Sequence, residues 1–337
     1  MKAVGYKESL AISEADSLID IELNEPKAAG RDLLVRIRAI SVNPVDTKIR
    51  MRAEPEAGGY KVLGWDAAGI VEAVGEECEN FSPGDEVWYA GAIDRSGTNA
   101  ELHLVDERIV GKKPASLDFA KAAAMPLTSI TAWEILFDRL QIKPGKRHTG
   151  EVLLIMGAAG GVGSMLTQLA SRLTGLTVVG TASRKETRQW IESLGADYII
   201  DHSKPLLAQL KSIGIEAVTH VASLTRSDLH FDSIVELIAP FGKIAMIDDP
   251  GPLDFTKLKT KSVSLHWELM YTRSLFKTPD MVEQHHLLNE VAELVDEGLL
   301  KTTFHEHYGV INAENLKKAH AMIESGKSKG KIVLEGF

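Results

Sequence analysis

Residues 152–163 read VLLIMGAAGGVG, five apolar residues followed at once by a glycine-rich turn. An amphipathic stretch continues to Leu173, so the expected order is buried strand, tight turn and helix. Small residues let backbone N–H groups approach a pyrophosphate, and a helix N-terminus carries partial positive charge. The pattern predicts a dinucleotide-binding turn. A ligand-free turn and an S-adenosylmethionine site are the alternatives.

Strand-like and helix-like segments alternate around this turn. The expected strands are 152–156, 177–181, 198–200, 217–222, 243–247 and 263–267. The expected helices lie near 161–173, 184–194, 204–212 and 228–239. Such alternation implies βαβ crossovers, so we predict an α/β fold with a doubly wound parallel sheet.

The first 120 residues have a different texture. Expected strands at 33–42, 64–74 and 86–90 are separated by glycine- and proline-rich turns, which is typical of a β-rich barrel or sandwich. Residues 119–140 then show helical spacing, and a polar loop is expected at 143–150. The segment after 270 reads as helix 279–298, strand 305–310, helix 313–325 and strand 331–335.

Composition limits the classes of protein. The 337 residues carry a net charge of −9, so a phosphate backbone is repelled and no nucleic-acid partner is expected. A single cysteine, Cys78, excludes a disulfide scaffold and a four-cysteine zinc lobe. No apolar run approaches a membrane span, and the first ten residues lack the apolar core of a secretory signal. We expect a two-domain cytoplasmic protein without a membrane partner.

The tip of the second predicted strand indicates which dinucleotide is bound. NAD sites place a carboxylate there, about 20 residues after the glycines, for the ribose 2′-hydroxyl. Here the tip carries Ser183, Arg184 and Lys185, with Arg188 one turn into the next helix. Guanidinium groups bind phosphate by charge-assisted hydrogen bonds, so NADPH is favoured over NADH. The alternative is a solvated helix start, although cations there oppose the helix dipole.

Four further motifs occur in order along the chain: SVNPVD at 41–46, LGWDAAG at 63–69, SPGDEV at 82–87 and MPLTSITAW at 125–133. With the glycine-rich turn, they make the chain resemble the medium-chain dehydrogenase/reductase superfamily. The likeness is to its zeta-crystallin-like quinone oxidoreductase branch, and more narrowly to bacterial zinc-type alcohol dehydrogenase-like proteins. This resemblance implies a GroES-like catalytic domain from residues 1–124 and 271–337, with a Rossmann NADP-binding domain at 125–270.

The chain departs from the zinc alcohol dehydrogenases at the metal site. The family's first zinc ligand is a cysteine where this chain has Asn43, and its second is a histidine where this chain has Trp65. The third falls within 125–131, which contains no Cys, His, Asp or Glu. Zinc needs three nitrogen, sulfur or oxygen ligands from the protein. We therefore predict that no metal is bound.

The resemblance also implies site residues. Asn43 and Thr128 are candidate hydrogen-bond donors, Asp46 is either a positioning carboxylate or a helix cap, and Trp65 is either a pocket wall or core packing. The expected cofactor contacts are Gly160, Gly161, Val162, Ser183, Arg184, Arg188, His202, Ser223, Leu224, Ile247 and Lys329.

Without a Lewis acid, reduction of a plain ketone is difficult, whereas a quinone or an α,β-unsaturated carbonyl spreads the charge that arrives with hydride. We therefore expect a zinc-independent NADPH:quinone oxidoreductase or enone reductase acting on a small molecule. A zinc-dependent alcohol dehydrogenase and a non-catalytic NADPH-binding sensor or structural protein remain as alternatives. By analogy with the family, the last Rossmann strand forms the edge at which a homodimer pairs.

Overall fold

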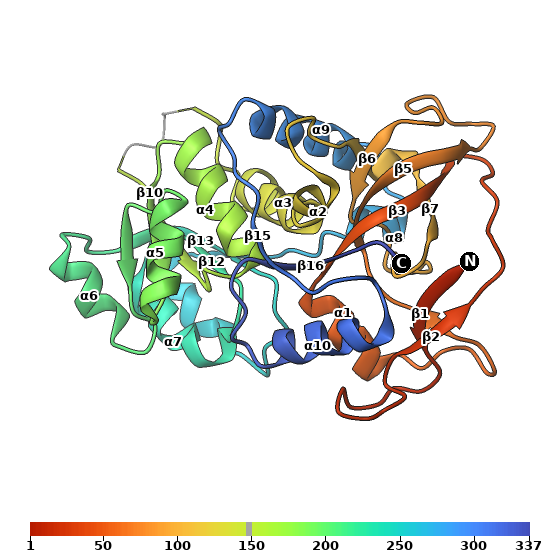
Figure 1. Cartoon of the computed structure of the whole chain (residues 1–337). Coiled ribbons are helices and arrows are strands. Elements are labelled where there is room, and N and C mark those ends of the chain that lie inside the picture. Colours follow the sequence, from red (N-terminus) through yellow and green to blue (C-terminus); the bar gives the residue numbers. More distant parts are fainter. Residues whose placement is uncertain (146–149) are drawn as a thin grey trace. The chain divides into compact units, whose positions relative to one another are not determined.

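The computed structural model describes residues 1–145 and 150–337 (Figure 1). The chain divides into a terminal unit, residues 1–130 with 271–337, and an inserted unit, residues 131–270. The first expected domain boundary, after residue 124, lies six residues before this division, and the second coincides with it. The polar loop expected at 143–150 falls partly on 146–149, which lie outside the described residues.

The terminal unit is built on a mixed sheet whose central strand is β3 (Asp32–Val42). Alternate residues of β3 are buried in its first half and all are buried from Ala39 onward, because further chain covers that end. In the sheet order β15-β16-β3-β5-β6-β8, with β7 also paired to β3, the last strands of the chain lie beside the early ones. The other strands are β5 (Asp66–Val74), β6 (Glu86–Tyr89), β7 (Leu102–Asp106), β8 (Val110–Lys112), β15 (Phe304–His307) and β16 (Lys331–Glu335).

A smaller sheet and several helices complete this unit. Strands β2 (Ile19–Glu22), β1 (Lys2–Tyr6) and β4 (Lys61–Val62) form an antiparallel sheet in that order. The helices are α1 (Pro44–Arg52), α2 (Phe119–Ala123), α8 (Thr272–Phe276), α9 (Glu283–Asp296) and α10 (Ala313–Glu324), with the short 3₁₀ turn η1 (Glu107–Ile109). Sequence reasoning did not identify α1, whose residues are largely polar and show no apolar periodicity.

The inserted unit contains a six-stranded parallel sheet in the order β11-β10-β9-β12-β13-β14. From central β9 the chain adds β10 and β11 on one side, and then returns to add β12, β13 and β14 on the other side. The strand order therefore reverses between β9 and β12, which is the doubly wound pattern. The predicted α/β architecture is confirmed. The strands are β9 (Val152–Met156), β10 (Thr177–Thr181), β11 (Tyr198–Ile200), β12 (Val218–Ser223), β13 (Ile238–Met246) and β14 (Ser264–Trp267). The helical segments are α4 (Gly161–Leu173), α5 (Lys185–Ser193), α6 (Leu206–Ser212), α7 (Ser227–Leu237) and η3 (Phe255–Lys261).

The stretch 119–140, whose spacing predicts helical structure, is divided into three helical elements. The chain forms α2, then α3 (Pro126–Trp133), and then a π-helical turn, η2 (Glu134–Arg139). Proline lacks an N–H and fits the first position of a helix, so Pro126 starts a new helix and does not continue the old one. Residues 122–132 are all buried, and the helical spacing of the sequence did not show these interruptions.

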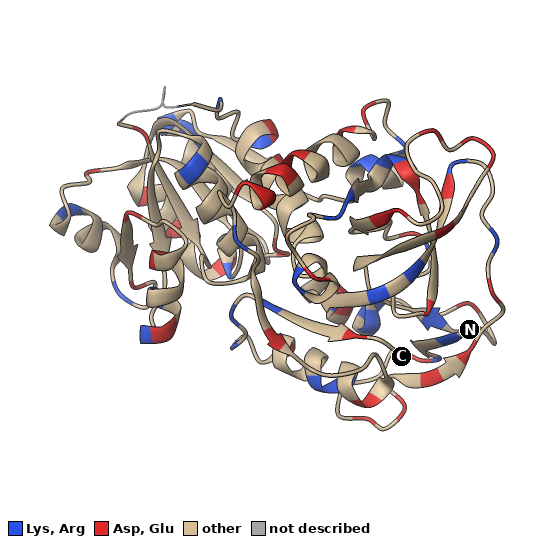
Figure 2. Ribbon diagram, turned by 45° about the horizontal axis from the view of Figure 1, so that its top comes forward, with Lys and Arg blue, Asp and Glu red and all other residues tan. Residues whose placement is uncertain are grey.

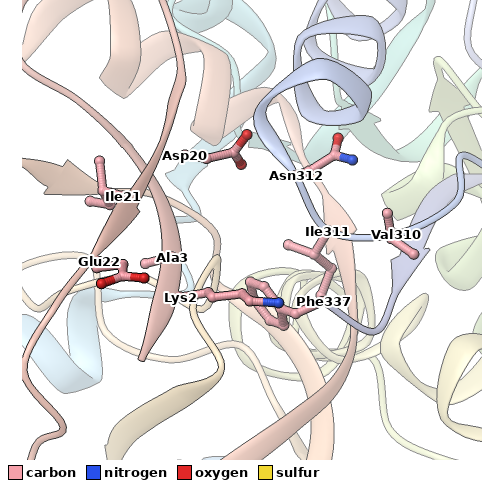
Figure 3. Close-up of a pocket in the computed structure, with 9 residues that line it drawn as sticks. All are labelled: Lys2, Ala3, Asp20, Ile21, Glu22, Val310, Ile311, Asn312 and Phe337. Atoms are coloured by element: carbon pink, nitrogen blue, oxygen red, sulfur yellow. The ribbon is translucent and has the colours of Figure 1, made fainter.

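Charged residues, one hollow and the lengths of the helices bear on what the protein can bind. In the part of the chain that the structure describes, Lys and Arg are interspersed with Asp and Glu along the ribbon (Figure 2). A hollow of about 360 Å³ lies where β1 and β2 meet the C-terminal segment, and none of the predicted site residues lines it (Figure 3). Across 1–145 and 150–337, no helix has both the length and the apolar character needed to cross a membrane.

Candidate active site

The glycine-rich turn joins β9 to α4 and is shaped by close backbone packing. A Cβ on Gly163 would lie 2.5 Å from the Gly157 carbonyl oxygen and 2.6 Å from the Ala158 Cα. Gly157 has a φ of +81°, and its N–H donates to the Thr181 hydroxyl at 3.0 Å. Helix geometry leaves the first N–H groups of α4, those of Gly161 and Val162, without helical partners. The turn therefore presents donors and positive potential suited to a pyrophosphate.

The tip of β10 carries no carboxylate at residues 182–184. Ser183 and Arg184 are exposed, and the Arg184 guanidinium lies 3.8 Å from Glu186. Arg188 instead donates to the backbone oxygens of Ala182 at 3.3 Å and Ile199 at 3.0 Å. Its guanidinium thus braces the backbone at the ends of two strands, β10 and β11.

Two more predicted cofactor residues lie elsewhere. His202 is exposed after β11, and its ring is 6.1 Å from that of His230 in a T-shaped pair. Lys329 is half-buried in the segment leading to β16. It contributes to lowering the pKa of His305, after burial.

At the carboxyl ends of β12 and β13 the chain forms a hydrogen-bonded group. The Ser223 hydroxyl lies 2.6 Å from that of Ser227, which donates to Asp248 at 2.6 Å. The Leu224 N–H donates to Met156, and the Ile247 N–H to Ser223. These hydrogen bonds bring the predicted residues 223, 224 and 247 together, next to the point between β9 and β12 where the strand order reverses. Ser227, which the sequence did not single out, fixes the group through Asp248.

In the terminal unit, Asn43 is the centre of a buried polar cluster. Its amide nitrogen donates to Asp66 at 2.8 Å and to the Ser41 carbonyl at 3.3 Å. Its amide oxygen accepts from the Lys331 ammonium, which also pairs with Asp66 at 2.8 Å. The side chains of Lys331 and Asp66 are 4% and 0% exposed, so this is an ion pair removed from water. The Leu127 N–H donates to the second Asp66 oxygen at 2.7 Å, so both oxygens of the buried carboxylate have partners.

Asp46 and Thr128 are near members of this cluster in the sequence, and each forms a hydrogen bond with a backbone group. Asp46 accepts from the Asn43 N–H at 2.5 Å as part of a capping box that starts α1, while its other oxygen is buried without a partner. Burial is the main cause that raises the pKa of Asp46 to about 7. The Thr128 hydroxyl donates to the Met125 carbonyl at 3.0 Å.

Trp65 is fully buried, and its indole N–H donates to the Ala92 carbonyl at 3.0 Å. Its ring meets Tyr271 edge-on, with centroids 6.3 Å apart. Sequence reasoning identified Lys329 and missed Lys331, Asp66 and Tyr271. The nearest signals were the LGWDAAG motif that contains Asp66 and the SKGK run at 328–331, in which the second lysine enters the cluster.

The residues at the positions of the family's zinc ligands do not fit zinc. Asn43 accepts from an ammonium group, and the Trp65 nitrogen carries a proton that is already donated. The positively charged Lys331 ammonium group binds the Asn43 and Asp66 oxygens that a metal ion would need as ligands. Within the part of the chain that the structure describes, no group of three His, Cys, Asp or Glu side chains could hold a metal.

Two family models match the chain: the alcohol dehydrogenase GroES-like domain over residues 29–115 and the zinc-binding dehydrogenase over 194–334. A zinc-type alcohol dehydrogenase-like protein of Staphylococcus aureus (strain MSSA476) is 39% identical, with 99% of each chain covered. This chain belongs to the medium-chain dehydrogenase/reductase superfamily. Its resemblance to the zeta-crystallin-like branch is confirmed.

Other members extend the comparison. A 2-methylene-furan-3-one reductase of Solanum lycopersicum is 34% identical over 60% of this chain and 53% of its own. A structure from Rhizobium etli CFN 42, named as a zinc-dependent alcohol dehydrogenase, is 55% identical with a TM-score of 0.97, covering 100% and 98% of the two chains. Two structures at 25% identity, each with 99% coverage of both chains, are a Pseudomonas syringae quinone oxidoreductase (TM-score 0.83) and a mycobacterial protein solved with NADPH (TM-score 0.85). The chain is an oxidoreductase of this superfamily, which uses a nicotinamide cofactor.

Proposed function

We propose that this medium-chain oxidoreductase reduces a quinone or an α,β-unsaturated carbonyl with NADPH and without zinc. The observation that carries the proposal is the buried Lys331–Asp66–Asn43 cluster, whose donor set does not fit a metal. A conjugated acceptor delocalises the charge of its reduced form, so orientation and hydrogen bonding can suffice, whereas reduction of a simple ketone is harder without a Lewis acid. The names of the tomato and Pseudomonas relatives support this class of substrate.

The inserted unit has the groups to hold NADPH, which when bound supplies the hydride. The N–H groups of Gly161 and Val162, which open α4, would bind the pyrophosphate. Gly160 would line the same site as the N-cap residue, since its own N–H donates to the Gly157 carbonyl at 3.2 Å. Ser183 and Arg184 would bind the 2′-phosphate, with Arg188 bracing the strand ends beneath them. We further propose contacts from the predicted residues His202, Ser223, Leu224, Ile247 and Lys329.

In the terminal unit, we propose that Asn43, Asp46 and Thr128 shape the reacting end of the site, with Trp65 as a wall. The amide N–H groups of Asn43 and the hydroxyl of Thr128 are already donated internally. Either residue would therefore have to exchange an internal bond before donating to an acceptor. Their most direct contribution is to fix the position and charge of the cluster.

We also propose that the protein is a homodimer. Strand β14 forms one edge of the parallel sheet. Trp267 and Leu269 at its end are 53% and 49% exposed, and Phe241 in the neighbouring β13 is 79% exposed. An unpaired edge flanked by large apolar side chains favours pairing with a second copy. The cytoplasmic location remains a prediction.

The test is NADPH oxidation with 9,10-phenanthrenequinone and with a 2-alkenal, using protein purified with chelator and assayed for zinc by elemental analysis. We expect turnover at substoichiometric zinc. Arg184→Ala should raise the KM for NADPH at least tenfold while changing that for NADH little, because only NADPH carries the 2′-phosphate. Zinc-dependent oxidation of simple alcohols, or tight NADPH binding with no acceptor reduced, would contradict the proposal.

A further inference from the structure

Tyr271 carries a hydroxyl that the fold leaves without a partner. The residue precedes α8 and is 2% exposed. Its phenol oxygen is buried and makes no hydrogen bond. A buried hydroxyl without a partner destabilises a protein, so such a group calls for a physical explanation.

The other buried tyrosines of the described chain are satisfied. The Tyr6 hydroxyl donates to the Ala53 carbonyl at 2.6 Å, and that of Tyr89 lies 3.0 Å from the His103 ring nitrogen. The contrast shows that this fold normally pairs its buried phenols. Tyr271 is the exception among them, and it lies beside the polar cluster.

The surroundings keep Tyr271 protonated. Its ring packs edge-on against Trp65 at an interplanar angle of 71°. Burial, followed by the charges of Asp46 and Asp66, raises the pKa of the phenol well above its ordinary value. A phenol in such a place does not ionise at working pH, so its O–H remains available as a donor.

We propose that the Tyr271 hydroxyl donates a hydrogen bond to the carbonyl oxygen of the acceptor during the reduction. This inference rests on the proposed function. As hydride adds to the conjugated carbon, the π electrons move to the carbonyl oxygen, and the Tyr271 O–H stabilises the negative charge there. Water then supplies the proton that completes the product, and Tyr271 keeps its own.

Tyr271→Phe removes only this donor, and Tyr6→Phe is the matched control within the same unit. For Tyr271→Phe we expect kcat to fall by about 10²–10³-fold, as for the loss of one oxyanion donor, with an unchanged Kd for NADPH. Its melting temperature should stay level or rise, because no native hydrogen bond is lost. Tyr6→Phe should do the reverse, with a lower melting temperature and an unchanged kcat.

A binding assay makes the inference independent of turnover. The probe is 4-nitrophenol, whose phenolate oxygen mimics the developing charge, titrated by absorbance against the protein with NADP⁺. Wild type should bind it at least tenfold more tightly than Tyr271→Phe. If wild type reduces no acceptor but binds the probe through Tyr271, the proposed reduction fails and the donor site stands. If Tyr271→Phe retains wild-type turnover and probe affinity, or if neither protein binds the probe, the assignment of Tyr271 is overturned.

Discussion

Replacement of Lys331 by methionine removes the cation of the buried cluster and keeps most of the volume of the side chain. Asp66 would then remain as a buried carboxylate, held only by the N–H groups of Asn43 and Leu127. Breaking one side of a buried ion pair destabilises a protein by about 3–5 kcal/mol. For a unit of this size, each kcal/mol lowers the melting temperature by about 2–4 °C, so we expect a decrease on the order of 10 °C.

The assay is urea unfolding of Lys331→Met, Asp66→Asn and the double variant, with Lys329→Met as the control. Lys329 lies two residues away and is only half-buried, so its loss should change the free energy of unfolding by less than about 1 kcal/mol. The double variant should be more stable than the sum of the single effects predicts, by about 2 kcal/mol or more. Additive effects, or a Lys331→Met protein as stable as the control, would refute the argument that the pair is energetically coupled.

Three other predictions concern pH, the glycine turn and assembly. Burial lowers the pKa of His103 from 6.5 to about 4, so this group should make stability fall as pH drops from about 6.5 towards 4, by on the order of 3 kcal/mol. Burial lowers the pKa of His320 as well, to about 3, so His103→Gln should make this part of the pH–stability curve shallower without flattening it. Gly163→Ala would press a Cβ against backbone and should lose about 1–3 kcal/mol of stability by thermal unfolding, whereas Gly160→Ala, whose nearest contact is at 3.5 Å, should be tolerated. Trp267→Glu should convert the proposed dimer to a monomer in sedimentation experiments, and a monomeric wild type would contradict that expectation.

The inserted unit was predictable because its signals are local. A strand, a glycine turn and a helix follow one another within residues 152–173. The apolar run, the glycines and the amphipathic spacing that indicate them are all visible in the sequence. The chain order of a doubly wound sheet then leaves few alternatives for the remaining strands. The division of the helical stretch 119–140 at Pro126 had a visible signal, but the π-helical turn at 134–139 had none.

The polar cluster was beyond sequence reasoning because its members meet only through tertiary pairing. Asn43 and Lys331 are 288 residues apart, and no spacing rule links them. Strand β16 pairs antiparallel with β3, which brings Lys331 to the end of β3 where Asn43 begins α1. The role of Tyr271 was hidden for a related reason, since a missing hydrogen bond leaves no trace in a sequence.

The pairing of β16 with β3 also has a consequence during synthesis. Asp66 leaves the ribosome 265 residues ahead of Lys331, which at about 5–20 residues per second is a delay of roughly 15–50 s. Residues 131–270 are synthesised within that interval. During this time Asp66, at the start of β5, still lacks the Lys331 ammonium that neutralises it. A chain that stops before residue 331 would therefore leave the Asp66 carboxylate without its cation and β3 without its neighbour β16.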